Sequence, residues 1–223
     1  MCGRFTLAIT WKELREAFPG FVMPDTWAPR YNIAPSQPVP VVPNDGRKKV
    51  KFFRWGLIPP WAQDPKIGNR MINARAETVA EKPSFRTAFR QRRCLVLADG
   101  FYEWRKQPGR KTKTPMYLQL KSGEPFAFAG LWERWQAPGA DPIHSCTIIT
   151  TVPNDLVKEI HNRMPVILDP QAYALWLDPA QVQPEQLDAW LKPYPALQMT
   201  AHAVSTVVNN PGNDLPACIE PVD

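Results

Sequence analysis

Proline occupies 26 of the 223 positions of this chain, and this frequency limits what the chain can fold into. Each proline fixes its own φ angle and lacks the amide hydrogen that a helix interior or a central strand requires. Long uninterrupted helices are therefore excluded, and a helix bundle with them. The composition instead predicts short helices and short strands that are joined by rigid turns.

The local sequence patterns predict where these short elements lie. Thr10 and Glu13 form a capping box that begins a helix ending near Phe18. The β-branched run from Ile143 to Thr151 is typical of a strand. Further helices are predicted at residues 83–90, 154–161, 169–176 and 184–191. Further strands are predicted at residues 39–42, 50–58, 94–98, 101–104, 116–120, 125–132, 166–168 and 198–204.

The order of these elements indicates the fold class. The proline-rich stretch that includes residues 30–35 is predicted to be an irregular loop that packs against the rest of the chain. Strands and helices are interspersed without the regular spacing of β-α-β units, which favours an α+β fold over a doubly wound sheet. We find no internal repeat, low-complexity tract or domain boundary, and we expect a single domain over residues 1–223.

The chain carries a formal net charge of +6, which favours a polyanionic partner. The positive charge is concentrated between residues 86 and 113, where nine lysines and arginines stand against Asp99 and Glu103. A basic segment of this kind can also be an ordinary solvated face of the fold. Charge alone does not separate the two readings.

Cysteine and histidine are too widely spaced to predict a metal site or a disulfide framework. These residues are Cys2, Cys94, Cys146, Cys218, His144, His161 and His202. The sequence has no C-x-x-C pair, no signal peptide and no apolar run of membrane length. We expect a cytoplasmic protein with reduced thiols, no bound metal and no membrane contact.

Cys2 becomes the N-terminal residue once Met1 is removed, and its small side chain permits that removal. Its amine and thiol then lie on adjacent carbons, with ordinary pKa values of about 8 and about 8.5. Such a 1,2-aminothiol can condense with an aldehyde through an imine and close a five-membered thiazolidine ring. It can alternatively attack an acyl group, with its own amine as the base. Taken alone, Cys2 is equally compatible with no special role.

Four short segments place polar side chains in apolar surroundings, at residues 1–5, 72–75, 98–104 and 160–165. Each has an ordinary structural explanation when taken singly. Asn73 suits a turn, Glu103 can pair with Arg105, and His161 can cap the C-terminus of a helix. Their occurrence together is what favours a chemical role.

With their neighbours, these segments form an ordered series of motifs. The series is M-C-G-R-F at 1–5, R-Y-N-I-A-P at 30–35, R-W-G-L-I-P-P-W at 54–61, I-N-A-R-A-E-T at 72–78, A-D-G-F-Y-E-W at 98–104 and H-N-R-M-P at 161–165. It covers nearly the whole chain and resembles the SOS response-associated peptidase (SRAP) family, whose members cross-link to abasic sites in single-stranded DNA.

The resemblance implies a compact α+β domain of curved, barrel-like sheets, mixed or antiparallel, with short helices at their flanks. It implies Cys2 as the covalent nucleophile, with Asn73, Glu103 and His161 as its active-site partners. Contacts to DNA are implied for Arg4, Pro35, Trp61, Arg75 and Arg163. The implied partner is single-stranded DNA that contains abasic sites, bound by a cytoplasmic, nucleoid-associated monomer without a cofactor. Met164 stands where relatives can carry a basic residue, which would weaken a phosphate contact.

The chemistry of an abasic sugar fits these roles. Only its open aldehyde reacts with an amine, and His161 is suited to open the ring because its charge changes near neutral pH. Burial among aromatic side chains should raise the pKa of Glu103, so that it can transfer protons during imine formation. Asn73 is expected to hold the Cys2 amine or a sugar oxygen, and Trp61 to stack on bases.

Three classes of function remain at this point. The first is a DNA-damage protein that links covalently to abasic sites and shields them, with potential strand-lyase chemistry through the imine. The second is an N-terminal-nucleophile hydrolase or self-processing peptidase, although only Met1 precedes Cys2 and autoproteolysis would be limited to one bond. The third is a noncovalent single-strand-binding module in which Cys2 plays no part.

Overall fold

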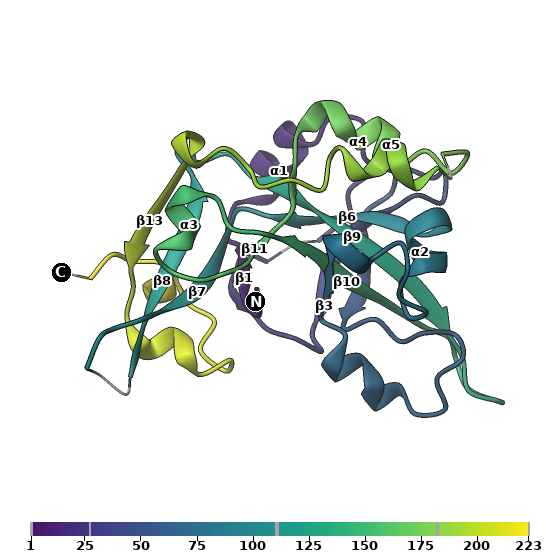
Figure 1. Cartoon of the computed structure of the whole chain (residues 1–223), viewed down its shortest axis with the longest axis horizontal. Helices are drawn as coiled ribbons and strands as arrows, with labels where there is room; N and C mark the ends of the chain where they lie inside the picture. Colours follow the sequence, from purple (N-terminus) through teal and green to yellow (C-terminus); the bar gives the residue numbers. More distant parts are fainter. Residues whose placement is uncertain (1, 27, 110–111, 182, 223) are drawn as a thin grey trace.

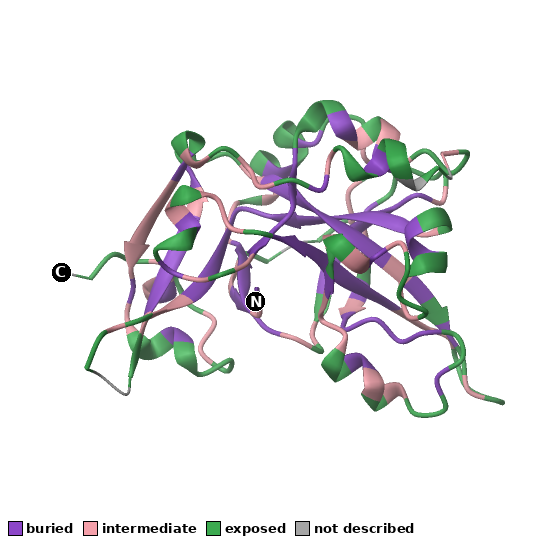
Figure 2. Cartoon of the chain, viewed as in Figure 1, coloured by how far each residue is buried: buried purple, intermediate pink, exposed green. Residues whose placement is uncertain are grey.

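Two β-sheets form the framework of the fold (Figure 1). The structure, a computed structural model, describes residues 2–26, 28–109, 112–181 and 183–222. Within these residues the strands are buried and the outer faces of the helices are exposed, as Figure 2 shows. No helix in the described ranges is long and apolar enough to cross a membrane.

The smaller sheet is antiparallel and carries the N-terminal strand in its interior. Its five strands, in spatial order, are β13 (Met199–Ala203), β8 (Lys113–Leu120), β7 (Gly100–Lys106), β1 (Phe5–Leu7) and β2 (Arg30–Ile33). β1 therefore lies between β7 and β2, with Phe5 opposite Phe101 on one side and Ile33 on the other.

The larger sheet closes on itself. Its strands, in spatial order, are β11 (Met164–Pro165), β10 (Ile143–Thr151), β4 (Lys51–Trp55), β3 (Pro38–Pro43), β6 (Arg93–Ala98), β9 (Phe126–Trp135) and β12 (Ile167–Leu168), and β5 (Asn73–Arg75) pairs with β10. Because β9 also pairs with β10, the strands β10, β4, β3, β6 and β9 form a closed five-stranded barrel. β10 runs parallel to β4 and β5, so the sheet is mixed. The predicted α+β fold with barrel-like sheets is confirmed.

The helices are all short in the described part of the chain, as the proline content predicts. The α-helices are α1 (Trp11–Ala17), α2 (Arg86–Gln91), α3 (Asp155–Lys158), α4 (Tyr173–Trp176) and α5 (Pro184–Asp188). The 3-10 helices are η1 (Pro65–Arg70), η2 (Ala76–Thr78), η3 (Pro170–Ala172), η4 (Ala196–Gln198), η5 (Thr206–Asn209) and η6 (Pro216–Cys218). The capping box of α1 is confirmed, since Thr10 and Glu13 each accept the other's backbone amide hydrogen.

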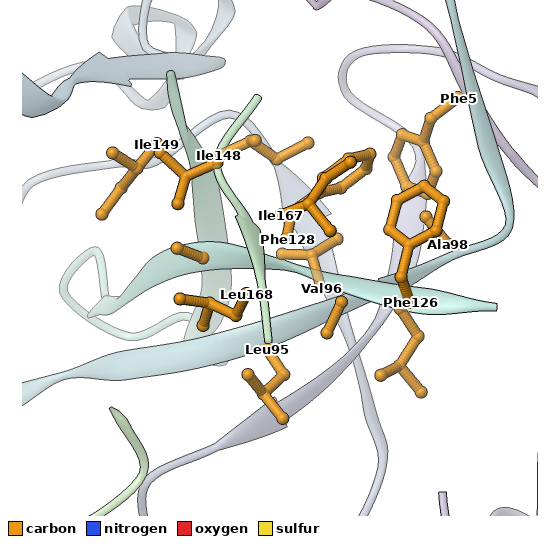
Figure 3. Close-up of a cluster of buried hydrophobic side chains, with 14 of the residues drawn as sticks. Phe5, Leu95, Val96, Ala98, Phe126, Phe128, Ile148, Ile149, Ile167 and Leu168 are labelled. Carbon is orange, nitrogen blue, oxygen red and sulfur yellow. The ribbon is translucent and has the colours of Figure 1, made fainter. Parts of the chain in front are cut away.

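Phe5 joins the two sheets within the core. Its ring packs edge-on against Trp55 of β4 at 5.1 Å and against Phe128 of β9 at 5.8 Å, measured between ring centroids. Figure 3 shows Phe5 beside Phe126 and Phe128 at the edge of the barrel core. Three residues after Cys2, the chain is therefore anchored in the barrel.

The loop predicted at residues 30–35 is wrong in its first part, because Arg30–Ile33 forms β2. The side chain of Asn32 donates hydrogen bonds to the carbonyl oxygens of Val208, Asn210 and Asn213 at 3.2, 3.1 and 2.6 Å. Asp214 accepts the backbone amide hydrogens of Tyr31 and Asn32 at 2.6 and 3.1 Å. Partners far along the chain thus complete this edge strand, and no local pattern announces them.

Several predicted elements are longer than those observed. The strand predicted at 50–58 ends at Trp55, because Gly56 has φ of +127° and its backbone lies against Gly68. A Cβ atom on Gly56 would lie 2.6 Å from the Gly68 carbonyl oxygen, so both the conformation and the space require glycine. The helices predicted at 83–90, 154–161 and 184–191 are observed as α2, α3 and α5 with shorter or shifted bounds.

Candidate active site

The pairing of β1 with β7 brings the N-terminal segment to the site. The backbone amide of Tyr102 donates a hydrogen bond to the carbonyl oxygen of Arg4 at 3.0 Å, so residues 2–4 run alongside Glu103. The thiol of Cys2 is fully buried and lies 3.9 Å from the Arg4 carbonyl oxygen. Burial raises the pKa of this thiol, and the nearby Glu103 carboxyl raises it further. Cys2 is therefore a neutral thiol near pH 7.

Asn73 holds the backbone of Cys2 from the opposite sheet. It lies at the start of β5, opposite Ile148 of β10, and its Nδ2 donates a hydrogen bond to the Cys2 carbonyl oxygen at 2.7 Å. Its Oδ1 is buried and has no hydrogen-bond partner among the described residues. A buried acceptor without a donor costs about 1–3 kcal/mol. The site therefore holds an acceptor that an incoming amine or hydroxyl group can satisfy.

Glu103 and His161 form an acid–imidazole pair beside Cys2. The Oε1 atom of Glu103 lies 3.8 Å from Nδ1 of His161, and the Glu103 side chain is only 4% exposed. Burial raises the pKa of Glu103 to about 7, as the sequence predicts. Burial also lowers the pKa of His161, which keeps the imidazole neutral near pH 7. Glu103 can therefore exchange protons near neutral pH, and the neutral imidazole of His161 can accept one.

Backbone hydrogen bonds hold the His161 ring in place. His161 follows α3, and its backbone amide donates to the Val157 carbonyl oxygen at 2.8 Å. The backbone amide of Arg163 donates to Nδ1 of the ring at 3.1 Å. The same Nδ1 atom lies 3.3 Å from the Arg163 carbonyl oxygen, which accepts a hydrogen bond when Nδ1 carries a proton, so the Arg163 backbone can bind either form of the ring. His161 can present an N–H donor to a substrate oxygen.

The raised pKa of Glu103 leads to a stability prediction for Glu103→Gln. The folded-state pKa of about 7 lies above the ordinary 4.5, so the stabilising effect of protonation is complete below about pH 4.5 and is lost as pH rises through 7. Glutamine stays neutral and removes this loss. We expect the free energy of unfolding of the variant to exceed that of the wild type by at most about 3 kcal/mol above pH 7. At pH 5 the difference should be small. Thermal unfolding at both pH values measures the difference.

Glu81→Gln, which changes an exposed carboxylate, is the matched control and should shift the melting temperature little at either pH. Equal melting-temperature differences at pH 5 and pH 8 for Glu103→Gln would contradict a raised pKa at this position.

Trp61 and Pro35 lie on two tight turns. Trp61 is 58% exposed on a turn in which the Ala62 amide donates to the Pro59 carbonyl oxygen at 3.0 Å. A pocket of about 660 Å³ beside Trp61 is lined in part by Lys66 and Arg70. Pro35 is half-buried on its own turn, where Ser36 adopts φ of +70°. An exposed indole next to basic side chains can stack on bases and attract phosphates.

Arg75 and Arg163 lie close to Asn73 and His161 in sequence, but their environments differ. Arg75 is exposed at the end of β5. Arg163 forms a two-pronged ion pair with Glu77, with N–O distances of 2.5 and 3.0 Å, and also donates to the Thr150 carbonyl oxygen at 2.6 Å. Glu77, for which the sequence predicts no role, holds the Arg163 guanidinium in place. Contacts of both arginines with DNA stay predictions.

Arg4 is mostly an internal residue, only 9% exposed. Its Nη1 atom donates to Oδ1 of Asn32 at 2.7 Å and to the Val208 carbonyl oxygen at 2.8 Å. Its guanidinium also lies 5.8 Å from the centre of the Trp104 ring. These contacts give Arg4 a structural role beside its predicted phosphate contact. Met164 is fully buried, so its side chain bears on packing and not on a phosphate.

The site has no metal-binding character in the residues that the structure describes. No group of three or more histidine, cysteine, aspartate or glutamate side chains there is arranged to hold a metal ion. The four cysteines are free and buried.

The fold and the site together define a class of protein, an α+β barrel in which Cys2 lies against an acid–imidazole pair. The chain belongs to the family of SOS response associated peptidases (SRAP), whose family model matches residues 1–211.

Relatives and solved structures agree with this assignment. The chain is 50% identical over 223 residues to the abasic site processing protein YoqW of Bacillus subtilis (strain 168), covering 99% of each chain. It is 33% identical to the abasic site processing protein HMCES of Pongo abelii, covering all of this chain and 77% of that one. A crystal structure of a Bacteroides thetaiotaomicron protein superimposes with a TM-score of 0.87 at 26% identity, covering 99% of this chain and 100% of that chain.

Proposed function

We propose that this protein recognises abasic sites in single-stranded DNA and links to them covalently through Cys2 after Met1 is removed. The product is a thiazolidine that shields the damaged strand. We propose that the protein acts as a monomer. We also propose that it needs no cofactor, because condensation of an amine and a thiol with an aldehyde neither oxidises nor reduces either partner. The relatives in Bacillus subtilis and Pongo abelii are named abasic site processing proteins, which supports the abasic site as the substrate.

One observation carries the proposal most directly. Cys2 is held by the hydrogen bond from Asn73 at 2.7 Å while an acid–imidazole pair, Glu103 and His161, lies next to it. A purely structural cysteine needs no such neighbours, and a buried glutamate with a pKa near 7 is costly to keep. Perturbed titrating groups that cluster around a nucleophile are typical of active sites.

The proposed reaction begins at the sugar. His161, in its imidazolium form, donates the Nε2 proton to the ring oxygen of the closed sugar while Glu103, as a carboxylate, accepts the proton of the C1′ hydroxyl group. The C1′–O4′ bond breaks and the aldehyde opens. Oδ1 of Asn73, which lacks a donor among the described residues, suits the amine of Cys2 or a sugar hydroxyl.

The cross-link then forms in two steps. The Cys2 nitrogen attacks C1′, Glu103 gives the proton that it took from the sugar to the departing hydroxyl group, and loss of one water leaves a protonated imine. The thiol adds to the same carbon: a C–S bond forms, the C=N electron pair returns to nitrogen, and the thiol proton passes to Glu103. Burial of the thiol, which disfavours a free thiolate, agrees with an order in which the amine reacts first.

The experiment that tests the proposal is an intact-mass measurement on the purified protein, before and after incubation with a single-stranded oligonucleotide that contains one abasic site. Protein that begins at Cys2 should gain the mass of the oligonucleotide less one water, and the adduct should survive heating. Undamaged and borohydride-reduced abasic oligonucleotides should give no adduct. Protein that retains Met1 has an amide nitrogen at Cys2, which is not nucleophilic, and should cross-link poorly. Efficient cross-linking by such protein would refute the aminothiol mechanism.

His161→Ala is predicted to slow adduct formation by about 10²-fold without weakening the binding of DNA, because its proposed work is proton transfer. The measurement is a single-turnover time course on a denaturing gel. The matched control is an oligonucleotide that carries an acyclic aldehyde, which has no ring to open. On that substrate the variant should approach the wild-type rate, whereas wild-type kinetics on the natural abasic site would remove His161 from the mechanism.

A further inference from the structure

The basic segment at residues 86–113 divides into two parts with different surroundings. In its first part, Arg93 is fully buried and Arg92 is paired with Glu133 at 2.8 Å, so these two charges are already engaged within the fold. At its end, Lys106 of β7 lies directly opposite Lys113 of β8. Like charges that face each other across two strands are destabilising, in a range of about 0.2–1 kcal/mol for such pairs. The packing of the sheet gives no reason for this juxtaposition.

A third lysine lies at the same place. Lys158, in the last turn of α3, lines one pocket of about 530 Å³ together with Lys106 and Lys113 (Figure 1 shows α3 beside the β7–β8 hairpin). We call this the lysine pocket. None of the three amines forms an ion pair within the described ranges. Glu159 also lines the pocket, which leaves an excess of positive charge.

The lysine pocket adjoins the candidate active site. His161 lines it, and Trp104, the residue after Glu103, forms an apolar wall. The indole of Trp104 is held in place because its Nε1 donates to Oδ1 of Asn209 at 2.7 Å. Burial is the main cause of the lowered pKa of His161, and the charges of Lys113 and Lys106 add to it. The positive charges of the lysine pocket therefore act electrostatically on His161 of the acid–imidazole pair.

We propose that the lysine pocket binds the phosphate of a nucleotide that adjoins the abasic sugar, with the sugar or base of that nucleotide packed against Trp104. This inference rests on the proposed function and adds to it a phosphate subsite formed by Lys106, Lys113 and Lys158. The volume of the pocket lies in the range of small-molecule sites, about 300–1,000 Å³, and suits a nucleotide better than a bare phosphate ion. Three amines around one phosphate also remove the repulsion between Lys106 and Lys113.

The test compares two triple variants that lose the same charge. Lys106→Ala/Lys113→Ala/Lys158→Ala empties the pocket of its amines, and Lys49→Ala/Lys82→Ala/Lys121→Ala removes three exposed lysines elsewhere. Noncovalent affinity for a single-stranded oligonucleotide with a central abasic analogue is measured over a range of salt concentrations. The pocket variant should bind about 10-fold more weakly at low salt, with a salt slope reduced by about 0.7–1. The control variant should keep the wild-type slope. Equal slopes and affinities in the two variants would overturn the proposal.

Truncated oligonucleotides distinguish a strand phosphate from a free one. One oligonucleotide ends directly 5′ of the abasic site and another directly 3′ of it. The truncation that removes the bound phosphate should abolish the difference in affinity between the wild type and the pocket variant. Which of the two oligonucleotides does so identifies the side of the abasic site whose phosphate enters the pocket. The proposal is wrong if both truncated oligonucleotides leave the difference in affinity between the two proteins unchanged and inorganic phosphate competes with the oligonucleotide at constant ionic strength. The pocket would then be a site for free phosphate.

The two proposals can fail separately. The salt comparison is repeated on an undamaged single strand, where no cross-link forms and Cys2 plays no part. A wild-type protein that never cross-links would refute the proposed function and leave the slope difference on undamaged DNA intact. Normal cross-linking with no slope difference would refute the lysine pocket alone. Circular dichroism and thermal unfolding confirm that both variants are folded.

Discussion

Replacing Cys2 with alanine is expected to abolish the heat-stable adduct with abasic DNA. Alanine keeps the α-amine but has no sulfur, so an imine can form and no thiazolidine ring can close. The affinity for undamaged single-stranded DNA should stay within about 2-fold of the wild type, because truncating this small buried side chain removes no charge. A denaturing gel after heating measures the adduct, and equal adduct yields from wild type and variant would rule out thiazolidine formation.

Cys2→Ser is the finer variant for the same experiment. Its hydroxyl group is a much weaker nucleophile than a thiol, and its amine is retained. We expect an adduct only when borohydride reduces the imine to a stable amine. An adduct that is equally heat-stable without borohydride would show that sulfur is dispensable.

Arg93→Met is expected to give the largest loss of stability among single substitutions of the basic segment. The guanidinium is fully buried and donates to five carbonyl oxygens, at distances of 2.6–3.0 Å. The acceptors are Phe89, Arg90, Trp176, Asp178 and Gln181. Methionine fills much of the space but leaves these acceptors without their donor. We expect the free energy of unfolding to fall by about 3–5 kcal/mol, as when one partner of a buried charged network is removed.

Chemical and thermal unfolding measure this loss, which corresponds to a fall in Tm of about 6–20 °C for a domain of this size. Arg90→Met is the matched control, because it makes the same change on an exposed position of α2 and leaves the Arg90 carbonyl in place. It should alter the free energy of unfolding by less than about 0.5 kcal/mol. Equal unfolding curves for the two variants would show that the Arg93 hydrogen bonds contribute nothing net.

Local chemistry explains which parts of the fold are predictable from the sequence. The capping box at Thr10 and Glu13 is complete within four residues, and the β-branched run at Ile143–Thr151 forms β10 with the predicted bounds. β2 is different, since its stability depends on carbonyl oxygens of residues 208–213, which a local pattern cannot reveal. Arg93 is misleading for the same reason: in the sequence it belongs to a basic run, and in the fold its charge is internal.

In the candidate site, too, some features are predictable from the sequence and others depend on contacts between distant parts of the chain. The ordered motifs predict that Cys2, Asn73, Glu103 and His161 belong together, and the structure brings them together. The sequence does not reveal that Glu77 holds Arg163, because this contact spans 86 residues. It does not reveal the lysine pocket either, since Lys158 has no local relation to the β7–β8 hairpin.

The bond between Arg4 and the Val208 carbonyl oxygen joins positions 204 residues apart, and it bears on when the site can form during synthesis. Ribosomes add about 5–20 residues per second, so residue 208 follows residue 4 by about 10–40 s. Until then β2 lacks the acceptors for Asn32, so one of the two strands that flank β1, the strand following Cys2, is not yet held in place. The nascent N-terminus is open during this interval. Trimming of Met1, which the proposed chemistry requires, has that time in which to act before the fold closes over the cysteine.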